Sequence, residues 1–193
     1  MKGLTWCALA AALLIALPAG AQLTVAGVKY EDAGEVRGGK VQLNGAGIRT
    51  RLVFKVYAAG LYLPRRATTP EEVLALAGPK RVSLTMLREV DATEFGQAFT
   101  KGIEDNHDQA TLARLSPSVQ RVNQVFAQHK QLRPGDTVAI DWIPGVGTLL
   151  TVKGAPQGEP LPDPEFYNAL LRIWLGAKPA DASLKEALLG KPG

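Results

Sequence analysis

The sequence predicts an α+β domain in which a large antiparallel β-sheet is covered by a layer of α-helices. Strand-like stretches of alternating or continuous apolar residues occur toward both ends of the chain, and amphipathic helical patterns lie between them. The turn sequence Pro-Gly-Val-Gly at residues 144–147 joins two strand-like stretches directly, which favours antiparallel pairing. Strands at both ends of a central helical block are typical of this fold class.

The first 21 residues have the layout of a secretory signal peptide. Lys2 precedes an apolar core over about residues 7–17, and small residues at 19–21 are typical of a cleavage site. A membrane anchor is the alternative, but this core is shorter than the ~20 apolar residues that span a bilayer. We therefore expect cleavage after about Ala21, a periplasmic or secreted protein, and one domain over residues 22–193 that spans no membrane.

Composition excludes several classes of function. The only cysteine, Cys7, lies in the predicted signal peptide, so the remaining domain has neither a disulfide nor a cysteine nucleophile. Loss of Lys2, the one charged residue of that segment, lowers the net charge of +4 by one unit. The other basic residues are scattered, with only short pairs such as 65–66 and 80–81, and this disfavours nucleic-acid binding.

The N-terminal half of the domain is predicted to consist mainly of strands. The glycine-rich stretch 33–40 separates two short strands as a hairpin, and residues 44–47 form a glycine-broken turn before a long strand that bends near Gly60. Pro70 begins a short helix that ends at Gly78, since proline favours the first helical position and glycine follows helix ends. The predicted strands of this half are residues 25–30, 41–43, 52–63 and 80–90.

The second half is predicted to alternate helices with one strand pair. Asp91 has the pattern of a helix cap because Glu94 follows three positions later, and apolar residues from Phe95 onward have helical spacing. The predicted elements are, in order, a helix after Asp91, a helix that begins at Ser116-Pro117 and closes by Pro134, two strands within 136–154, a helix capped by Asp163 and a short helix from Ser183 to Gly190.

Few residues of the sequence suit catalysis or metal binding. His107 and His129 lie in polar stretches, where we expect exposed side chains. Residues 104–108, Glu-Asp-Asn-His-Asp, lack the spacing of a metal-binding loop, and no metal is expected. The chain has no hydrolase nucleophile elbow, phosphate-binding loop or dinucleotide fingerprint, so no cofactor is expected either.

Several stretches together resemble the chalcone isomerase-like superfamily, with the greatest likeness to its bacterial secreted branch. They are LNGAGIR (43–49), KVYAAGLYL (55–63), TEFGQAFTKGIEDN (93–106), PGVGT (144–148) and the C-terminal segment 166–190. Each stretch is weak evidence by itself, whereas their order and spacing are specific. The resemblance implies a chalcone isomerase-like fold, in which a cleft lies between a large antiparallel sheet and a helical layer.

The resemblance also implies roles for particular positions. In plant chalcone isomerases, the arginine of the glycine motif binds the ionised substrate with help from polar side chains on the next strand and on two helices. Of these groups only the arginine is kept, as Arg49. The other positions fall, by alignment, at Tyr57, Phe95, Gly102 and Ile173 or Trp174. In plant fatty-acid-binding proteins of this fold, an arginine and a tyrosine hold a carboxylate, and Arg49 and Tyr57 match those two positions.

Three hypotheses follow for the function. In the first, a non-catalytic protein binds a small amphipathic acid such as a fatty acid, with Arg49 and Tyr57 on the carboxylate. Its tail would contact an apolar wall formed by Phe95, Phe99, Ile173 and Trp174. In the second, the chain is an isomerase, or intramolecular lyase, of chalcone isomerase type, with Arg49 as the catalytic group that stabilises an anion. In the third, it binds an unidentified protein of the cell envelope through its outer surface.

Structural roles remain open for the same residues. Arg49 could be a solvated turn residue or an ion-pair partner, and the aromatic residues could belong to an ordinary core. Arg51 and Lys55 alternate with the apolar positions of the same stretch, so we expect both to be solvated.

Overall fold

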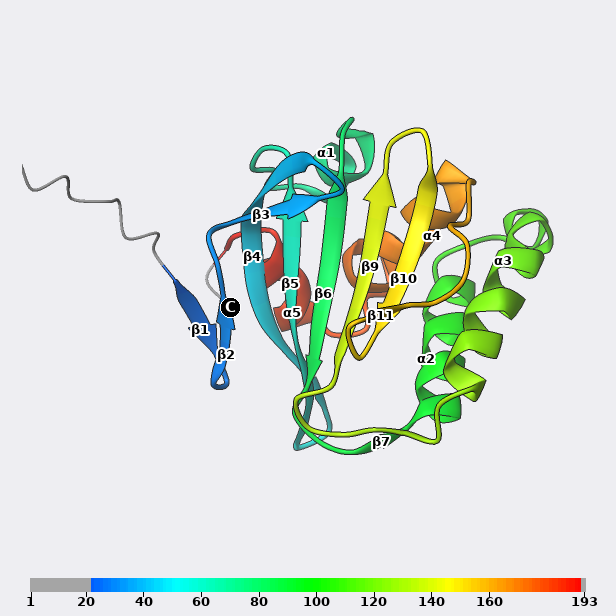
Figure 1. Cartoon of the computed structure of the whole chain (residues 1–193), viewed down its shortest axis with the longest axis horizontal. Coiled ribbons are helices and arrows are strands. Elements are labelled where there is room, and N and C mark those ends of the chain that lie inside the picture. Colours follow the sequence, from blue (N-terminus) through cyan, green and yellow to red (C-terminus); the bar gives the residue numbers. More distant parts are fainter. Residues whose placement is uncertain (1–21, 192–193) are drawn as a thin grey trace, which may run out of the picture.

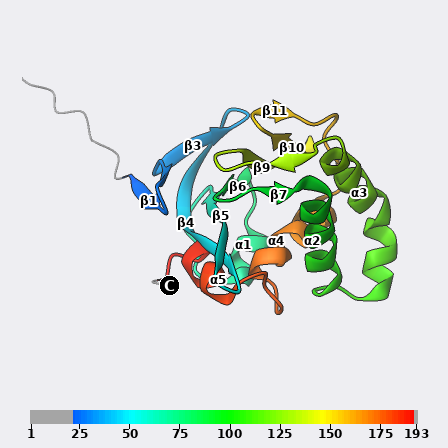
Figure 2. The same cartoon turned by 90° about the horizontal axis from the view of Figure 1, so that it is seen from below.

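The computed structural model describes residues 22–191, and the predicted signal peptide lies outside them. Its main feature is a seven-stranded antiparallel sheet with the order β11-β10-β9-β6-β5-β4-β3, and two small sheets, β1-β2 and β7-β8, lie beside it. The sheet is curled, and the helices gather on one of its faces (Figures 1 and 2). This arrangement confirms the predicted α+β class.

The strands are β1 (Leu23–Val25), β2 (Val28–Tyr30), β3 (Ala33–Val36), β4 (Gly39–Arg51), β5 (Phe54–Leu63), β6 (Lys80–Met86), β7 (Val90–Asp91), β8 (Gln131–Leu132), β9 (Thr137–Ile143), β10 (Gly147–Val152) and β11 (Ala155–Pro156). The helices are α1 (Pro70–Ala75), α2 (Ala92–Glu104), α3 (Gln109–Ala127), α4 (Pro164–Leu175) and α5 (Ala182–Leu188). Within residues 22–191, no helix combines the length and apolarity needed to cross a bilayer.

The predicted turn at residues 44–47 is wrong, because these residues lie inside β4, a strand of 13 residues. The glycines serve a close approach of α5 to this strand. A Cβ added at Gly45 would lie 2.0 Å from the carbonyl oxygen of Ala187, and one at Gly47 would lie 2.7 Å from the Ala187 Cβ. Glycine inside a strand commonly marks such an approach of another element. The chain instead turns at Leu52-Val53, between β4 and β5.

Asn44 joins β4 to two distant parts of the chain. Its buried amide nitrogen donates to the carbonyl oxygens of Ala67 (2.9 Å) and Leu188 (2.7 Å). Its side-chain oxygen accepts from the Ala67 backbone nitrogen at 2.8 Å. Because a buried amide without partners is costly, this satisfied side chain fixes the end of α5 on the strand that carries Arg49. The Asn-Gly-Ala-Gly stretch is therefore a docking surface for α5.

Further boundaries differ from the predictions, and the predicted strand over 80–90 is divided into β6 and β7, which belong to different sheets. The stretch 33–40 forms the β3-β4 hairpin itself, with its turn at Arg37-Gly38, and residues 25–30 divide into β1 and β2. Helix α3 begins at Gln109 and contains Pro117, whereas the predicted start was Ser116. Asp108 caps this earlier start, since its side chain accepts from the backbone nitrogen of Thr111 at 2.8 Å.

The predicted caps of α2 and α4 are confirmed, whereas α5 is capped by Asp181 and begins at Ala182, not at the predicted Ser183. Asp91 accepts from the backbone nitrogens of Thr93 and Glu94 at the start of α2, and Asp163 accepts from that of Glu165 at the start of α4. Helices α2 and α4 contact each other, α5 contacts β4, and α3 packs on α2. The main hydrophobic core fills the space between these helices and the sheet.

Candidate functional site

Arg49 and Tyr57 are cross-strand partners at one end of the β4-β5 hairpin. Directly opposed residues of an antiparallel pair project from the same face of the sheet. The guanidinium carbon of Arg49 lies 5.6 Å from the centre of the Tyr57 ring, which is within the range of a cation–π contact. A shift of register follows between Arg49 and Thr50, so the pair stands where regular pairing of the two strands is interrupted.

Tyr57 is almost completely buried, with 3% of its surface exposed. The indole nitrogen of Trp174 donates a hydrogen bond of 2.9 Å to its hydroxyl oxygen. This bond uses a lone pair of the oxygen and leaves the hydroxyl hydrogen free to be donated. Burial raises the pKa of the Tyr57 hydroxyl to about 12, although the positive charge of Arg49 lowers it in part. Tyr57 is therefore a neutral donor at physiological pH.

The Arg49 guanidinium lacks a strong partner within the described part of the chain. Its Nε atom is buried and has no hydrogen-bond acceptor, and the guanidinium forms no ion pair there. Asp181 is nearby, but its carboxylate accepts from the backbone nitrogens of Thr50 (2.8 Å) and Leu184 (3.0 Å). A buried N–H of a cation without an acceptor is costly, and an anion bound there would remove this cost.

Apolar side chains surround this pair on the helical side. The rings of Phe95 and Phe99 lie 5.1 Å apart, Phe95 is 6.1 Å from Tyr57, and Phe99 is 5.6 Å from Trp174. Ile173 and these aromatic residues all belong to the main core. Contacts thus link five of the six residues singled out in the sequence, and Ile173 lies in the same core.

A hollow of about 330 Å³ opens beside the pair, and of the six residues Arg49 and Phe95 line it. The complete lining is Arg49, Arg51, Leu52, Phe54, Val56, Arg88, Glu89, Val90, Asp91, Glu94, Phe95 and Ala98. The other four residues, Tyr57, Phe99, Ile173 and Trp174, are buried in the main core and are not part of the lining. Their predicted role as walls around a ligand's tail stays a prediction.

The comparisons with known proteins identify the family and the fold. The sequence model of the family described as chalcone isomerase-like matches residues 21–190. The chain belongs to the chalcone isomerase-like family. Among solved structures, a fatty-acid binding protein from Arabidopsis thaliana has a similar fold, with a TM-score of 0.62 and 15% sequence identity. That match covers 84% of this chain and 92% of the plant protein. No curated protein matches the chain significantly in sequence.

The resemblance implies polar groups at three helix positions of the plant enzymes, and this chain has Phe95, Gly102 and either Ile173 or Trp174 there. A Cβ added at Gly102 would lie 2.9 Å from the Ile173 Cγ2 atom, so α2 and α4 are in direct apolar contact there. Ring closure of a chalcone develops negative charge that needs hydrogen-bond donors placed to meet it. Neither Gly102 nor Ile173 has a donor side chain, so neither could meet that charge.

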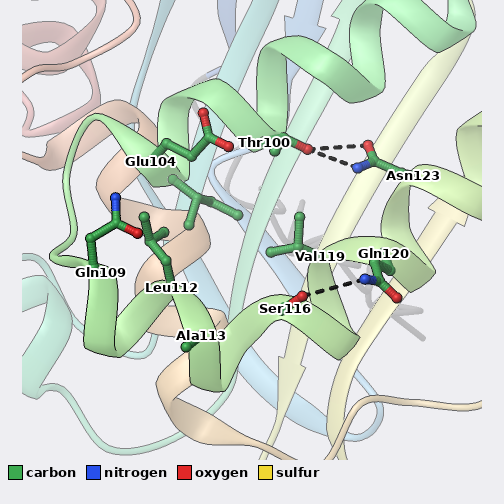
Figure 3. A pocket seen from close by; sticks show the side chains of 10 residues that line it. Thr100, Glu104, Gln109, Leu112, Ala113, Ser116, Val119, Gln120 and Asn123 are labelled. Atoms are coloured by element: carbon green, nitrogen blue, oxygen red, sulfur yellow. Dashed lines mark hydrogen bonds between the residues drawn. The ribbon is translucent and has the colours of Figure 1, made fainter.

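A second and larger hollow lies between α2 and α3 (Figure 3). It has a volume of about 690 Å³, and at one side of it Thr100 and Asn123 join the two helices by hydrogen bonds of 3.2 and 2.8 Å. Glu104 is the one charged residue of its lining. Because this groove offers no cation to a carboxylate, the hollow beside Arg49 is the better site for an acid.

Sequence reasoning missed Arg88 and the role of Trp174. The guanidinium of Arg88 lies 4.6 Å from the ring centre of Phe54 and lines the same hollow as Arg49. Arg88 follows the end of β6, where no local pattern marks it. The two histidines are half-buried, whereas exposed side chains were predicted. One of them, His107, has its Nδ1 atom 2.8 Å from the Ile103 carbonyl oxygen at the end of α2.

Proposed function

We propose that this protein binds a small amphipathic carboxylic acid such as a fatty acid, without catalysis, and that Arg49 and Tyr57 hold its carboxylate. The observation that carries the proposal is the buried Nε of Arg49, which has no acceptor in residues 22–191 and lies beside a neutral tyrosine donor. An arginine fork and a hydroxyl group together offer a carboxylate three donors.

The surroundings of the pair suit an amphipathic molecule better than a small polar anion. Val56, Phe95 and Ala98 contribute apolar surface to the hollow, next to the cationic group. Its volume of about 330 Å³ is at the lower end of the usual range for small-molecule sites. A longer acid would need the aromatic side chains behind Phe95 to move apart. Family membership supports the proposal because a protein of the same fold from Arabidopsis thaliana is a fatty-acid binding protein.

The binding proposal is tested by recovering the ligand. The protein is purified from its native host and extracted with organic solvent, and the extract is analysed by mass spectrometry. The delipidated protein is then titrated with fatty acids, with Arg66→Met as a matched control because Arg66 is exposed and outside the hollow. A stoichiometric acid that is lost in Arg49→Met and kept in Arg66→Met supports the proposal. The absence of both an extracted acid and fatty-acid binding refutes it.

We also propose export to the periplasm or the medium after cleavage near Ala21. Support comes from the lysine, apolar core and small residues within 1–21. The intact mass of the protein recovered from the periplasmic fraction or the medium tests this directly. A mass that corresponds to a chain beginning at Gln22 is expected. A protein that keeps all of residues 1–21 and stays in the cytoplasm contradicts export.

An isomerase of chalcone isomerase type is the second candidate function. It is favoured by one observation, the cationic Arg49 beside the ring of Tyr57, whose hydroxyl is neutral, since these two groups could stabilise a developing enolate. The direct apolar contact of Gly102 with Ile173 weighs against it. Incubation with chalcones, followed through the loss of their visible absorbance, separates the two functions. A rate above that of buffer that is abolished by Arg49→Met would favour the enzyme.

A further inference from the structure

The tip of the β4-β5 hairpin exposes three consecutive apolar side chains. Leu52 is 88% exposed, Val53 is 84% exposed and Phe54 is 53% exposed. The hairpin turns at the end of the molecule where β7 lies (Figure 1). Contiguous exposed apolar side chains on a soluble domain commonly mark a surface that binds a protein or a membrane.

Neither turn geometry nor packing explains these residues. Leu52 has a φ of 57°, in the left-handed region that favours glycine, asparagine or aspartate in a hairpin turn. A leucine adopts this conformation only with strain. Its side chain and that of Val53 are too exposed to contribute to the core, so a polar turn would serve the fold better. An apolar tip is therefore a feature that the fold does not require.

Cationic side chains surround the tip. Arg51 and Lys55 flank it in the sequence and are exposed, and the Arg88 guanidinium covers the ring of Phe54 at 4.6 Å. Three carboxylates also line the neighbouring hollow, and two of them accept hydrogen bonds from neutral donors, which hold them in place but do not cancel their charge. Asp91 caps α2, and Glu89 accepts from the side chain of Gln131 at 3.0 Å. Glu94, in the first turn of α2, is the third carboxylate of the lining.

We propose that this tip docks on an anionic lipid bilayer. Leu52, Val53 and Phe54 enter the interface between head groups and acyl chains, while Arg51, Lys55 and Arg88 meet lipid phosphates. A lipid surface fits the size of the patch. A specific protein complex usually buries about 800 Å² on each partner, far more than three side chains can offer. A few apolar side chains with adjacent cations are enough for reversible binding to anionic lipid.

This docking goes beyond the proposed function and needs no bound acid. It does have a consequence for the site. Leu52, Phe54 and Arg88 form part of the lining of the hollow that contains Arg49. A bilayer bound at the tip would therefore lie against the opening of the hollow, where amphipathic acids partition between membrane and water.

Sedimentation with lipid vesicles tests the proposal. The protein is purified from its native host, in the form that the host produces. Vesicles of phosphatidylcholine are compared with vesicles that also contain phosphatidylglycerol. Wild-type protein is expected to bind the anionic vesicles and to dissociate at high salt. Leu52→Ser combined with Val53→Ser should weaken binding at least tenfold. Arg51→Gln combined with Lys55→Gln should weaken it about 25-fold, since each cation near such a surface contributes about fivefold.

The matched control is Val146→Ser, which alters another exposed apolar turn residue, between β9 and β10, and should leave binding unchanged. Val53→Trp provides a second readout, because its indole fluorescence should shift to the blue when anionic vesicles are added. Equal binding by the wild type and both double variants overturns the proposal. So does a change of oligomeric state in Leu52→Ser/Val53→Ser without a change in vesicle binding, which would assign the tip to a second copy of the chain.

Discussion

Replacement of Arg49 by methionine separates a ligand-binding arginine from a structural one. The substitution removes the guanidinium and keeps much of the apolar stem. Within residues 22–191 the guanidinium forms no ion pair and its Nε has no acceptor, so the empty protein loses no charged hydrogen bond. It loses the contact with the Tyr57 ring, which stabilises the protein by about 0.5–1 kcal/mol. The substitution also removes the cost of burying part of a charged group, and this change stabilises the protein.

Binding of an acid should respond much more strongly. A hydrogen bond between a cation and a carboxylate contributes about 1.5–3 kcal/mol. The dissociation constant of a fatty acid should therefore rise by a factor of about 10 to 150 in Arg49→Met. Isothermal titration of the delipidated proteins measures this change, with Arg66→Met as the control that should match the wild type.

Thermal unfolding of the same delipidated proteins supplies the test that can refute this reasoning. The net effect on stability should stay within about 1 kcal/mol, which corresponds to a change in Tm of about 2–4 °C for a domain of this size. A fall in Tm of more than about 8 °C would show that Arg49 is a buried structural partner. An unchanged affinity for the acid would show that another group holds the carboxylate.

Three further predictions follow from individual contacts. Tyr57→Phe should weaken acid binding by about 1 kcal/mol in a titration. It should also lower the free energy of unfolding by about 1–3 kcal/mol, because the indole N–H of Trp174 loses its acceptor, and an unchanged Tm would contradict this hydrogen bond. Gly45→Ala should destabilise the fold by more than about 2 kcal/mol in urea unfolding, since its Cβ would lie 2.0 Å from a carbonyl oxygen of α5. The control Gly34→Ala, whose Cβ would lie 3.7 Å from its nearest atom, should be nearly neutral. Equal urea midpoints for the two variants would contradict the close approach of α5. Burial lowers the pKa of Lys80 from 10.5 to about 8. Between these two pH values the unfolded chain binds more protons than the folded protein, so stability should rise as the pH increases from about 8 to about 10. Lys80→Met should remove that rise and stabilise the protein at neutral pH, and an identical pH profile of Tm in both proteins would contradict the assignment.

The sequence predicted the elements whose signals are local. The caps of α2 and α4 were recognisable because an aspartate and the residues just after it carry the whole signal. The interpretation of residues 44–47 failed because glycine is also the local signal of a turn. The reason for Gly45 and Gly47 is α5, which follows about 140 residues later in the chain, and no nearby residue reveals that contact.

The start of α3 failed for a related reason. Pro117 is a good first residue of a helix, and the sequence analysis gave it that position. The structure instead tolerates it within the helix, because Asp108 caps an earlier start and the helix continues past the proline. Here two valid local signals competed, and the structure uses the cap at Asp108 as the start of the helix.

The sequence predicted which residues belong to the candidate site better than it predicted how their side chains are packed. The resemblance to a family placed Arg49 and Tyr57 together, and the structure makes them cross-strand partners. The bond from Trp174 to Tyr57 joins residues 117 positions apart, and the packing of Gly102 against Ile173 depends on the approach of two helices. No sequence pattern marks either contact. The sequence therefore could not predict that side chains fill the region between the sheet and the helices.

The charge state of a bound acid tests the central claim most directly. Delipidated protein is loaded with a fatty acid that carries an isotope label at its carboxyl carbon, and the resonance of that carbon is followed by NMR as the pH is lowered. If Arg49 and Tyr57 hold the carboxylate, the pKa of the bound acid is below its ordinary value in the wild type, because a nearby cation and a hydrogen-bond donor favour the ionised form. That pKa should move up again in Arg49→Met and stay low in Arg66→Met. A bound acid with the same pKa in all three proteins, or no saturable bound resonance, would contradict the account.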